Sequence, residues 1–409
     1  MAMEYGLVGR TLGHSFSPLL HRLLWGADYG LMPMAEEELE PFFRARSFRG
    51  VNVTVPYKKT VMPFLDEIDN RALRIGCVNT VIRQEDGRLV GYNTDYDGFG
   101  LLADRTGISF SGRNVLIFGS GATAGTAACV AEDRGCRKVT YVSRTGKVNY
   151  QNLDTQRDAE ILINATPVGM FPDNGSAPAD PALFPACRGV LDVVYNPLKS
   201  RLVQRAASLG LPASGGLPML AGQAAAAMPL FGAGTCSPAL LEQVLTRLER
   251  MQQNIVLIGM PGSGKSTVGR MLAKALDRPL IDTDQMVTEQ AGKSIPCIFG
   301  EDGEASFRRM EAEMIRKAAV RTGCVISIGG GGVLLPENRE ALTWNGRIYY
   351  LDRDAGLLCR RGRPLSDSGA ALDRMVKKRT PIYEELCDRR VENNGTIQTA
   401  VQDILSDFM

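Results

Sequence analysis

A glycine-rich segment in the second half of the chain has the residue types and spacing of a phosphate-binding loop. Residues 259–267 read Gly-Met-Pro-Gly-Ser-Gly-Lys-Ser-Thr and fit the pattern G-x-x-x-x-G-K-[ST]. Backbone N–H groups of such a loop surround phosphate oxygens, while Lys265 would reach the terminal phosphates and the Ser266 hydroxyl would ligate Mg²⁺. We therefore expect ATP binding here, and a glycine loop that binds no nucleotide is the alternative. The predicted ATP contacts are Gly262, Ser263, Gly264, Lys265, Ser266 and Thr267.

A second glycine loop, in the middle of the chain, fits a dinucleotide site. Residues 118–125 read Phe-Gly-Ser-Gly-Ala-Thr-Ala-Gly, which matches G-x-G-x-x-G/A directly after an apolar run. The next apolar run, 138–142, ends in Ser143, Arg144 and Thr145 rather than in a carboxylate. A planar guanidinium suits the 2′-phosphate of NADP, so we expect NADP rather than NAD. The alternatives are a plain turn at the loop and a solvated charge at Arg144. The predicted loop contacts are Gly119, Gly121, Ala122, Thr123 and Ala124.

Carboxylates, glycines and arginines follow the first loop in an order that suits phosphoryl transfer. Asp282 and Asp284 lie two residues apart at the end of a strand-like run, so one could serve Mg²⁺ and the other an acceptor hydroxyl. The alternative is that they cap the next helix. Glycines 329–332 would let a substrate lie against backbone N–H groups. The arginine-rich segment 360–365 resembles a lid over phosphates. Its alternative, a nucleic-acid patch, lacks interleaved aromatic residues.

Four polar clusters in the first hundred residues could bind a substrate with several hydroxyls. They are residues 13–18, 52–58, 77–80 and 91–95, and each carries small hydroxyl or amide groups. Lys58 and Asp95 could relay a proton while a hydride moves to or from the same carbon. With only two histidines in the chain, acid–base chemistry falls to lysine and carboxylates. Taken singly, each cluster could be ordinary turn chemistry.

The pattern of strands and helices predicts an α/β protein with three parts. Residues 112–215 alternate strand-like runs (114–118, 138–142, 160–164, 190–194) with helix-like stretches, which predicts a parallel sheet covered on both faces. We expect a substrate-binding domain at 1–100, a Rossmann-like NADP domain at 101–216, and helices at 217–250 that pack back on the first domain. A P-loop domain related to nucleoside monophosphate kinases is expected at 253–409, after a polar boundary at 249–253.

Composition excludes several other classes of protein. The net charge of +2 gives no global field for nucleic acid, and no run of about 18 apolar residues predicts a membrane span. The first ten residues have no basic segment followed by an apolar core, so we do not expect secretion. Nine scattered cysteines without a C-x-x-C pair indicate reduced thiols. We expect a cytoplasmic enzyme with small-molecule substrates.

The first 250 residues resemble shikimate dehydrogenase. The motifs G-H-S-x-S-P, N-V-T-V-P-x-K, V-N-T, G-x-N-T-D, the glycine loop, N-A-T-P-x-G-M and D-x-x-Y-N-P come in that family's order. The resemblance implies that Lys58 and Asp95 are the catalytic pair and that Ser143, Arg144, Thr145 and Thr166 bind NADP. Cys77 stands where the family often has Ala, and Ser143 where it often has Asn. Quinate is the alternative substrate. The implied substrate contacts are Ser15, Ser17, Asn52, Thr54, Lys58, Asn79, Asp95, Tyr195 and Gln223.

Residues 253–409 resemble shikimate kinase, through the P-loop, Asp282-Thr283-Asp284, G-E-x-x-F-R, G-G-G and R-P-L. The resemblance implies that Ser266 and Asp282 serve Mg²⁺, that Asp284 orients the attacking hydroxyl, and that Lys265 and Arg363 neutralise the transferring phosphoryl group. Arg363 would also contact ATP. The lid at 361–370 looks short for the family. The implied shikimate contacts are Asp284, Arg308, Gly329, Gly330, Gly331 and Arg379.

Together, the two resemblances predict a bifunctional enzyme that makes shikimate and then phosphorylates it. Two alternatives stay open. The kinase half could act on another small acceptor, such as gluconate or a nucleotide, or one half could have lost catalysis and become regulatory. The sequence does not predict the oligomeric state or whether the intermediate passes directly between the sites.

Overall fold

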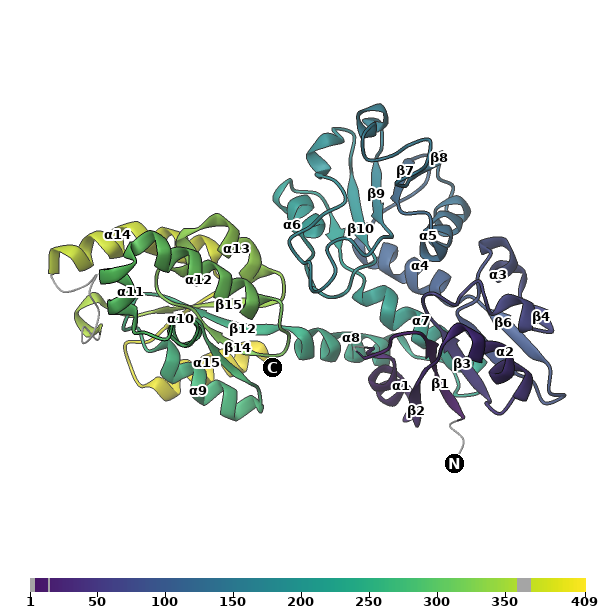
Figure 1. Ribbon diagram of the computed structural model, residues 1–409, viewed down its shortest axis with the longest axis horizontal. Helices are drawn as coiled ribbons and strands as arrows, with labels where there is room; N and C mark the ends of the chain where they lie inside the picture. The colour runs from purple at the N-terminus through teal and green to yellow at the C-terminus, as the bar shows by residue number, and fades with distance from the viewer. Residues whose placement is uncertain (1–3, 14, 359–368) are drawn as a thin grey trace. The chain divides into compact units, whose positions relative to one another are not determined.

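The computed structural model describes residues 4–13, 15–358 and 369–409, and its chain divides into two compact units. Unit 1 comprises Met1–Met170, Ser176–Asn196 and Ser200–Arg247, and unit 2 contains Leu248–Met409. Figure 1 shows helices packed around β-sheets in each unit. The predicted α/β class is confirmed.

Unit 1 begins with a mixed six-stranded sheet of order β2-β1-β3-β5-β6-β4. β1 pairs in parallel with β2 and β3, whereas β5 is antiparallel to both β3 and β6. Apolar side chains from α2, such as Leu39 and Phe43, share one core cluster with Val51 and Val81. The strands are β1 (Tyr5–Gly9), β2 (Tyr29–Pro33), β3 (Gly50–Val53), β4 (Glu67–Ile68), β5 (Thr80–Arg83) and β6 (Leu89–Tyr92).

The second sheet of unit 1 is parallel throughout, with the order β11-β10-β9-β7-β8. Successive side chains of β7 point to opposite faces, as expected for a strand. Val115 and Ile117 pack in one core cluster, and Leu116 and Phe118 pack in another, so both faces are covered. The strands are β7 (Asn114–Phe118), β8 (Lys138–Val142), β9 (Ile161–Asn164), β10 (Gly189–Asp192) and β11 (Ala213–Ser214).

The helices of unit 1 connect and cover these sheets. α4 packs against α5 and α7, and α7 also contacts α1. Between β8 and β10 the connections contain only short 3₁₀ turns, at Leu153–Gln156 and Pro181–Leu183, instead of α-helices. The helices are α1 (Ser17–Trp25), α2 (Glu36–Ala45), α3 (Asn70–Ile75), α4 (Asp95–Thr106), α5 (Ala122–Asp133), α6 (Arg201–Ser208) and α7 (Leu217–Leu230).

Unit 2 is built on a parallel sheet of order β13-β14-β12-β15-β16, and α8 (Pro238–Gln252) leads into it. The central strand β12 is fully buried: Ile255 and Leu257 pack in one core cluster, and Val256 and Ile258 in the other. Such a strand needs helices on both faces of its sheet. The strands are β12 (Asn254–Ile258), β13 (Leu280–Asp282), β14 (Val325–Ser327), β15 (Gly346–Asp352) and β16 (Arg389–Glu392).

The helices of unit 2 supply those two layers. α15 and α9 contact each other, and their apolar side chains belong to the cluster of Ile255 and Leu257. Side chains of α12, α13 and α14 belong to the other cluster. The helices are α9 (Lys265–Leu276), α10 (Thr283–Ala291), α11 (Ile295–Glu301), α12 (Gly303–Ala319), α13 (Pro336–Thr343), α14 (Gly369–Leu386) and α15 (Ile397–Phe408).

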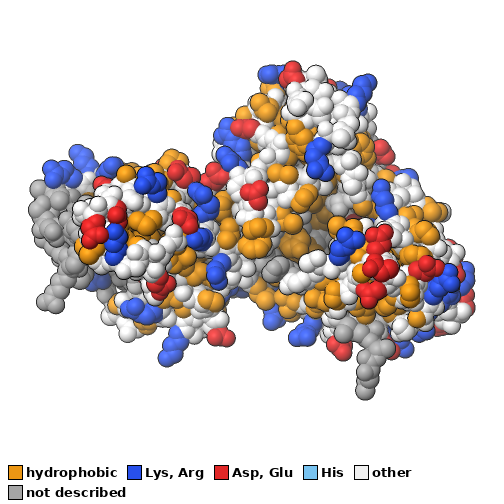
Figure 2. Space-filling model, viewed as in Figure 1, with side chains coloured by type: hydrophobic (Ala, Val, Ile, Leu, Met, Phe, Trp, Pro, Cys, Tyr) orange, Lys and Arg blue, Asp and Glu red, His pale blue; other side chains and the backbone are white. Residues whose placement is uncertain are grey.

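Charge is spread over the visible surface of the chain. Figure 2 shows basic and acidic side chains intermixed on that face, in keeping with the net charge of +2. Among the described residues, no helix combines the length and the apolar character that crossing a bilayer requires.

Candidate active sites

A polar cavity of about 190 Å³ in unit 1 collects every residue predicted to bind the dehydrogenase substrate. They come from separate elements: Ser17 begins α1, Asn52 lies on β3, Asp95 begins α4 and Gln223 lies on α7. Thr123, predicted as a cofactor contact, also lines this cavity. The complete lining is Leu7, Ser15, Ser17, Asn52, Val53, Thr54, Lys58, Asn79, Asp95, Thr123, Val193, Tyr195, Gly216, Met219, Leu220 and Gln223.

The two charged residues of this cavity form an ion pair. The Lys58 ammonium donates to Oδ2 of Asp95, and their side chains are only 12% and 8% exposed. Because both groups are shielded from water, the attraction between them is stronger than that of a surface pair. The cavity therefore holds a lysine that can give a proton as an ammonium group, or take one as an amine, next to a carboxylate that keeps it in place.

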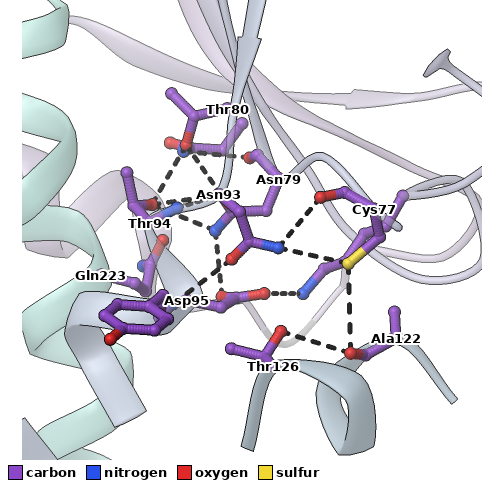
Figure 3. A network of polar contacts seen from close by, with 12 residues as sticks. Cys77, Asn79, Thr80, Asn93, Thr94, Asp95, Ala122, Thr126 and Gln223 are labelled. Carbon is purple, nitrogen blue, oxygen red and sulfur yellow. Dashed lines mark hydrogen bonds and ion pairs between the residues drawn. The ribbon is translucent and has the colours of Figure 1, made fainter. Parts of the chain in front are cut away.

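A network of neutral polar groups holds the other oxygen of Asp95. The Asn79 amide donates to Oδ1 of Asp95 at 2.9 Å and to the Thr94 hydroxyl at 3.1 Å, while its own carbonyl accepts the Thr94 backbone N–H at 2.7 Å. Figure 3 shows this network, with Asn93 donating to the backbone and sulfur of Cys77 nearby. Asp95 is thus fixed from both oxygens, one by a cation and one by an amide.

The predicted NADP contacts lie at the ends of parallel strands in unit 1. Gly119 has φ 108° and follows β7, and a side chain there would collide with the Ala165 carbonyl beside Thr166. A Cβ at Gly121 would meet no atom within 4 Å, so this backbone is open to a ligand. α5 begins at Ala122, and Ala124 is fully buried. Ser143, Arg144 and Thr145 follow β8, and Arg144 is exposed.

The phosphate-binding loop of unit 2 connects β12 to α9. Gly264 precedes α9 with φ 95°, a conformation that favours glycine. Lys265 is 8% exposed, and its ammonium donates to the carbonyls of Gly259 and Met260, both at 2.9 Å. The lysine therefore lies along the loop that it would serve. Ser263 is buried, whereas Ser266 is exposed.

Asp282 caps a helix, as its alternative role predicts, and also contacts Ser266, its predicted partner in Mg²⁺ binding. Its Oδ1 caps α10 by accepting the backbone N–H of Asp284 at 3.1 Å, and its Oδ2 accepts the Ser266 hydroxyl at 2.8 Å. A hydroxyl beside a single carboxylate suits Mg²⁺, which keeps several of its waters in most protein sites. Among the described residues, no three His, Cys, Asp or Glu side chains cluster as a metal site.

The glycine run after β14 is where the remaining parts of the kinase site meet. A Cβ on Gly329 would collide with the carboxylate of Asp284, and one on Gly331 would collide with the guanidinium of Arg308. A Cβ on Gly330 would lie 2.6 Å from Pro261 of the phosphate-binding loop. Glycine is required here because these side chains approach the backbone directly. The structure thus brings Asp284 and Arg308 to the loop.

Arg379 reaches the same place from α14. It is 6% exposed and interacts with Tyr383, whose hydroxyl donates to the Gly330 carbonyl at 2.5 Å. Burial raises the pKa of Tyr383 to about 12, which keeps this hydroxyl protonated as a donor. Arg363 and residues 360–368 of the predicted lid lie outside the described residues, so the structure does not test this prediction.

Glu311 belongs to this site and was not predicted from the sequence. Its side chain is 2% exposed, and it accepts from Arg308 at 2.7 Å. Burial raises the pKa of Glu311, and the Arg308 charge offsets part of that rise. The signal was present, because residues 308 and 311 are neighbours on a helix face. Thr80 lies in the predicted cluster 77–80 but was not named as a site residue, and it is buried without lining the cavity.

Comparison with known proteins identifies the first unit. Residues 7–81 match the family model described as the shikimate dehydrogenase substrate binding domain. A shikimate dehydrogenase (NADP(+)) from Clostridium beijerinckii is 35% identical over 240 residues, covering 54% of this chain and 88% of that protein. The chain belongs to the shikimate dehydrogenase family.

Solved structures of this family resemble the same part of the chain. Shikimate dehydrogenase 1 from Peptoclostridium difficile is 31% identical with a TM-score of 0.55, covering 60% of this chain and 97% of its own. The shikimate 5-dehydrogenase from Thermus thermophilus, solved with NADP(H) and shikimate, is 33% identical with a TM-score of 0.54 and covers 60% and 99%.

The remainder of the chain matches a second family. Residues 261–408 fit the family model described as shikimate kinase. The chain therefore joins a shikimate dehydrogenase to a shikimate kinase domain, and the resemblances inferred from the sequence are confirmed.

Proposed function

We propose that this chain catalyses two consecutive reactions, the reduction of 3-dehydroshikimate to shikimate and the phosphorylation of shikimate to shikimate 3-phosphate. One observation carries the first reaction: the buried Lys58–Asp95 pair lies in a cavity lined by hydroxyl and amide groups. For the second, Asp284 and Arg308 meet the glycine run beside the phosphate-binding loop. The match to both families supports this proposal.

In the dehydrogenase site, Lys58 would give a proton to the carbonyl oxygen of the substrate as that carbonyl is reduced. Asp95 would hold the ammonium in place, since it is itself fixed by Asn79. Ser15 and Ser17, at the start of α1, would bind the carboxylate, and the amide groups would bind hydroxyls. Tyr195 and Gln223 would close the cavity. These assignments use only groups that line the cavity.

The NADP assignment is supported by the fit of the glycine loop. NADPH, when bound, supplies the hydride. The open backbone at Gly121 and the N-terminus of α5 suit a pyrophosphate, and the exposed Arg144 suits a 2′-phosphate. We assign Gly119, Ala122, Thr123, Ala124, Ser143, Thr145 and Thr166 to the same site.

In the kinase site, Asp284 would orient the hydroxyl that attacks, and Arg308 with Arg379 would pair with the carboxylate of shikimate. Mg·ATP, when bound, supplies the phosphoryl group. Lys265 would turn from the loop carbonyls to the phosphates, and Ser266 with Asp282 would hold Mg²⁺. Gly329, Gly330 and Gly331 would contact shikimate through their backbone. Catalysis is then mainly positioning and charge neutralisation.

We also propose the domain limits and the location inferred from the sequence: 1–100 with helices 217–250, 101–216, and 253–409, in a cytoplasmic enzyme. The described cysteines are free thiols, which suits a reducing compartment.

Two assays on the purified chain test the function. One follows NADP⁺ reduction by shikimate, and the other follows ATP consumption with shikimate, gluconate or a nucleoside monophosphate as acceptor. We expect shikimate to support both reactions. Phosphorylation of gluconate alone would overturn the kinase assignment, and NAD⁺ used as well as NADP⁺ would overturn the cofactor assignment.

A further inference from the structure

We propose that Thr80 is a positioning residue of the dehydrogenase site: its hydroxyl joins Asn52 to Asn79 and so orients the amide that holds Asp95. This inference rests on the proposed dehydrogenase function. Thr80 is fully buried at the start of β5 and does not line the cavity, so it acts only through its neighbours.

One series of hydrogen bonds leads through Thr80 from Tyr29 to Asp95. The Tyr29 hydroxyl donates to Oδ1 of Asn52 at 2.8 Å, and the Asn52 amide donates to the Thr80 hydroxyl at 2.9 Å. The Thr80 hydroxyl donates to Oδ1 of Asn79 at 3.1 Å, and the Asn79 amide donates to Oδ1 of Asp95 at 2.9 Å. Figure 3 shows the part of this chain from Thr80 to Asp95. Every donor thus points toward the carboxylate, and each bond polarises the next.

Two backbone groups fix that direction. The Asn79 backbone carbonyl can only accept, and the Asn52 amide donates to it at 3.3 Å, so the nitrogen of Asn52 must face this side. The Thr94 backbone N–H can only donate, and it bonds to Oδ1 of Asn79 at 2.7 Å. Rotating the Asn52 amide by half a turn would place its oxygen against the Asn79 carbonyl. Rotating the Asn79 amide would place its nitrogen against the Thr94 N–H. The Thr80 hydroxyl accepts from Asn52, and it lies 3.1 Å from both Oδ1 of Asn79 and the Thr94 hydroxyl. It therefore reaches Asn79 either directly or through Thr94, which donates to the same Oδ1 at 3.2 Å.

Tyr29 is the first donor in this series of hydrogen bonds. Burial raises the pKa of Tyr29 well above its ordinary value, so the hydroxyl remains a donor. Its ring stacks on His21 at 4.1 Å between centroids, which holds it beside Asn52. The N–H groups of Asn52 are occupied by Thr80 and Asn79, and its side chain also interacts with His21, so only its carbonyl oxygen is left to face a substrate. Asn52 is then an acceptor for a substrate hydroxyl and cannot donate to the carboxylate.

The test compares Thr80→Val, which removes the hydroxyl at nearly constant shape, with Thr80→Ser, which keeps it. For Thr80→Val we expect kcat of the dehydrogenase to fall by about tenfold or more and KM for shikimate to rise, because two buried polar groups lose a partner. KM for NADP⁺ should change by less than about twofold, since the series of hydrogen bonds ends at Asp95 in the substrate cavity. Thr80→Ser should recover most of the loss, and the kinase activity of the same chain should not change.

Two results would overturn the proposal: Thr80→Val with kcat and KM within about twofold of the unaltered chain, or Thr80→Ser as impaired as Thr80→Val.

If Thr80→Val is misfolded and no longer binds NADP⁺, the variant Tyr29→Phe provides the test instead. We expect a several-fold rise in KM for shikimate alone, with Tyr5→Phe as control because the Tyr5 hydroxyl donates to the Phe231 carbonyl instead. An unchanged KM for shikimate in Tyr29→Phe would then refute the proposed series of hydrogen bonds. A lack of shikimate-dependent NADP⁺ reduction in the unaltered chain would instead refute the proposed function.

Discussion

The two sites of this chain hold their reactive groups by different means. In unit 1, the Lys58–Asp95 pair is held by a network of neutral amides and hydroxyls. In unit 2, Arg308 is held by the carboxylates of Glu304 and Glu311, and Lys265 lies on backbone carbonyls. The first site orients one ion pair with neutral groups, and the second brings several charged side chains together.

The difference follows from the chemistry proposed for each site. A carbonyl reduction needs one proton delivered at a defined atom, so an oriented hydrogen-bond network is useful there. Phosphoryl transfer needs charge neutralised over several oxygens, and arginine and lysine side chains can supply that from more than one position. The changes below are ordered from the largest expected effect to the smallest.

Removing the charge of Asp284 should have the largest effect, because it is the carboxylate that we place against the attacking hydroxyl. For Asp284→Asn we expect the phosphorylation kcat to fall by about 10³-fold, with shikimate-dependent NADP⁺ reduction unchanged. Glu289→Gln, an exposed position on the same helix, is the control. A loss of less than about tenfold in steady-state kinetics would show that Asp284 is not needed for the hydroxyl.

Removing the exposed charge of Arg144 tests whether unit 1 also uses a charged side chain to bind its cofactor, away from Lys58 and Asp95. For Arg144→Ala we expect KM for NADP⁺ to rise by about 30- to 100-fold, as a charged hydrogen bond to the 2′-phosphate is lost. KM for NAD⁺ should not change. Arg137, exposed just before the opposite end of β8, gives the matched variant Arg137→Ala. Equal losses with both cofactors would remove Arg144 from the site.

The neutral interior of unit 1 should make its stability sensitive to acid. Burial lowers the pKa of His21 to about 4, whereas an unfolded histidine titrates near 6.5, so the unfolded state binds a proton first as the pH falls. The free energy of unfolding should therefore drop by about 1.5 kcal/mol between pH 6.5 and pH 5.

This loss can be followed with urea and Trp25 fluorescence, because the Trp25 indole donates to His21 at 3.0 Å. Trp344→Phe removes the second of the two tryptophans of the chain. In the His21→Gln variant of that background the pH dependence should flatten. The same slope with and without His21 would mean that other groups cause it.

The charged surroundings of Arg308 should tolerate change better than the neutral network does. For Glu311→Gln we expect the kinase KM for shikimate to rise by about tenfold, because Arg308 keeps Glu304 but loses its buried partner. Glu313→Gln, exposed on the same helix and paired with Lys317, is the control. If both variants keep the parental KM, Glu311 does not position Arg308.

The sequence predicted the elements better than the contacts among them. Apolar runs such as 114–118 and 254–258 match β7 and β12, because buried parallel strands are continuously apolar. The helix after the phosphate-binding loop begins at Lys265, since Gly264 has the positive φ that precedes it. The alternation expected in 112–215 was too regular, because the connections between β8 and β10 contain only 3₁₀ turns.

The sites show the same limit. The predicted substrate contacts of the dehydrogenase were assigned from motifs and their order along the sequence, and the structure brings them to one cavity. Their individual roles remain predictions. Glu311 could have been assigned from its spacing to Arg308 on α12, whereas the role of Thr80 depends on Asn52, which lies on a different strand. The direction of a hydrogen-bond chain also depends on backbone groups that no motif records.

The most direct test of the account measures both activities in the variants Lys58→Ala and Lys265→Ala. We expect Lys58→Ala to lose NADP⁺ reduction by about 10³-fold and to keep ATP-dependent phosphorylation of shikimate, and Lys265→Ala to show the opposite pattern. Loss of both activities from either change, or of neither, would contradict two separate catalytic sites on one chain.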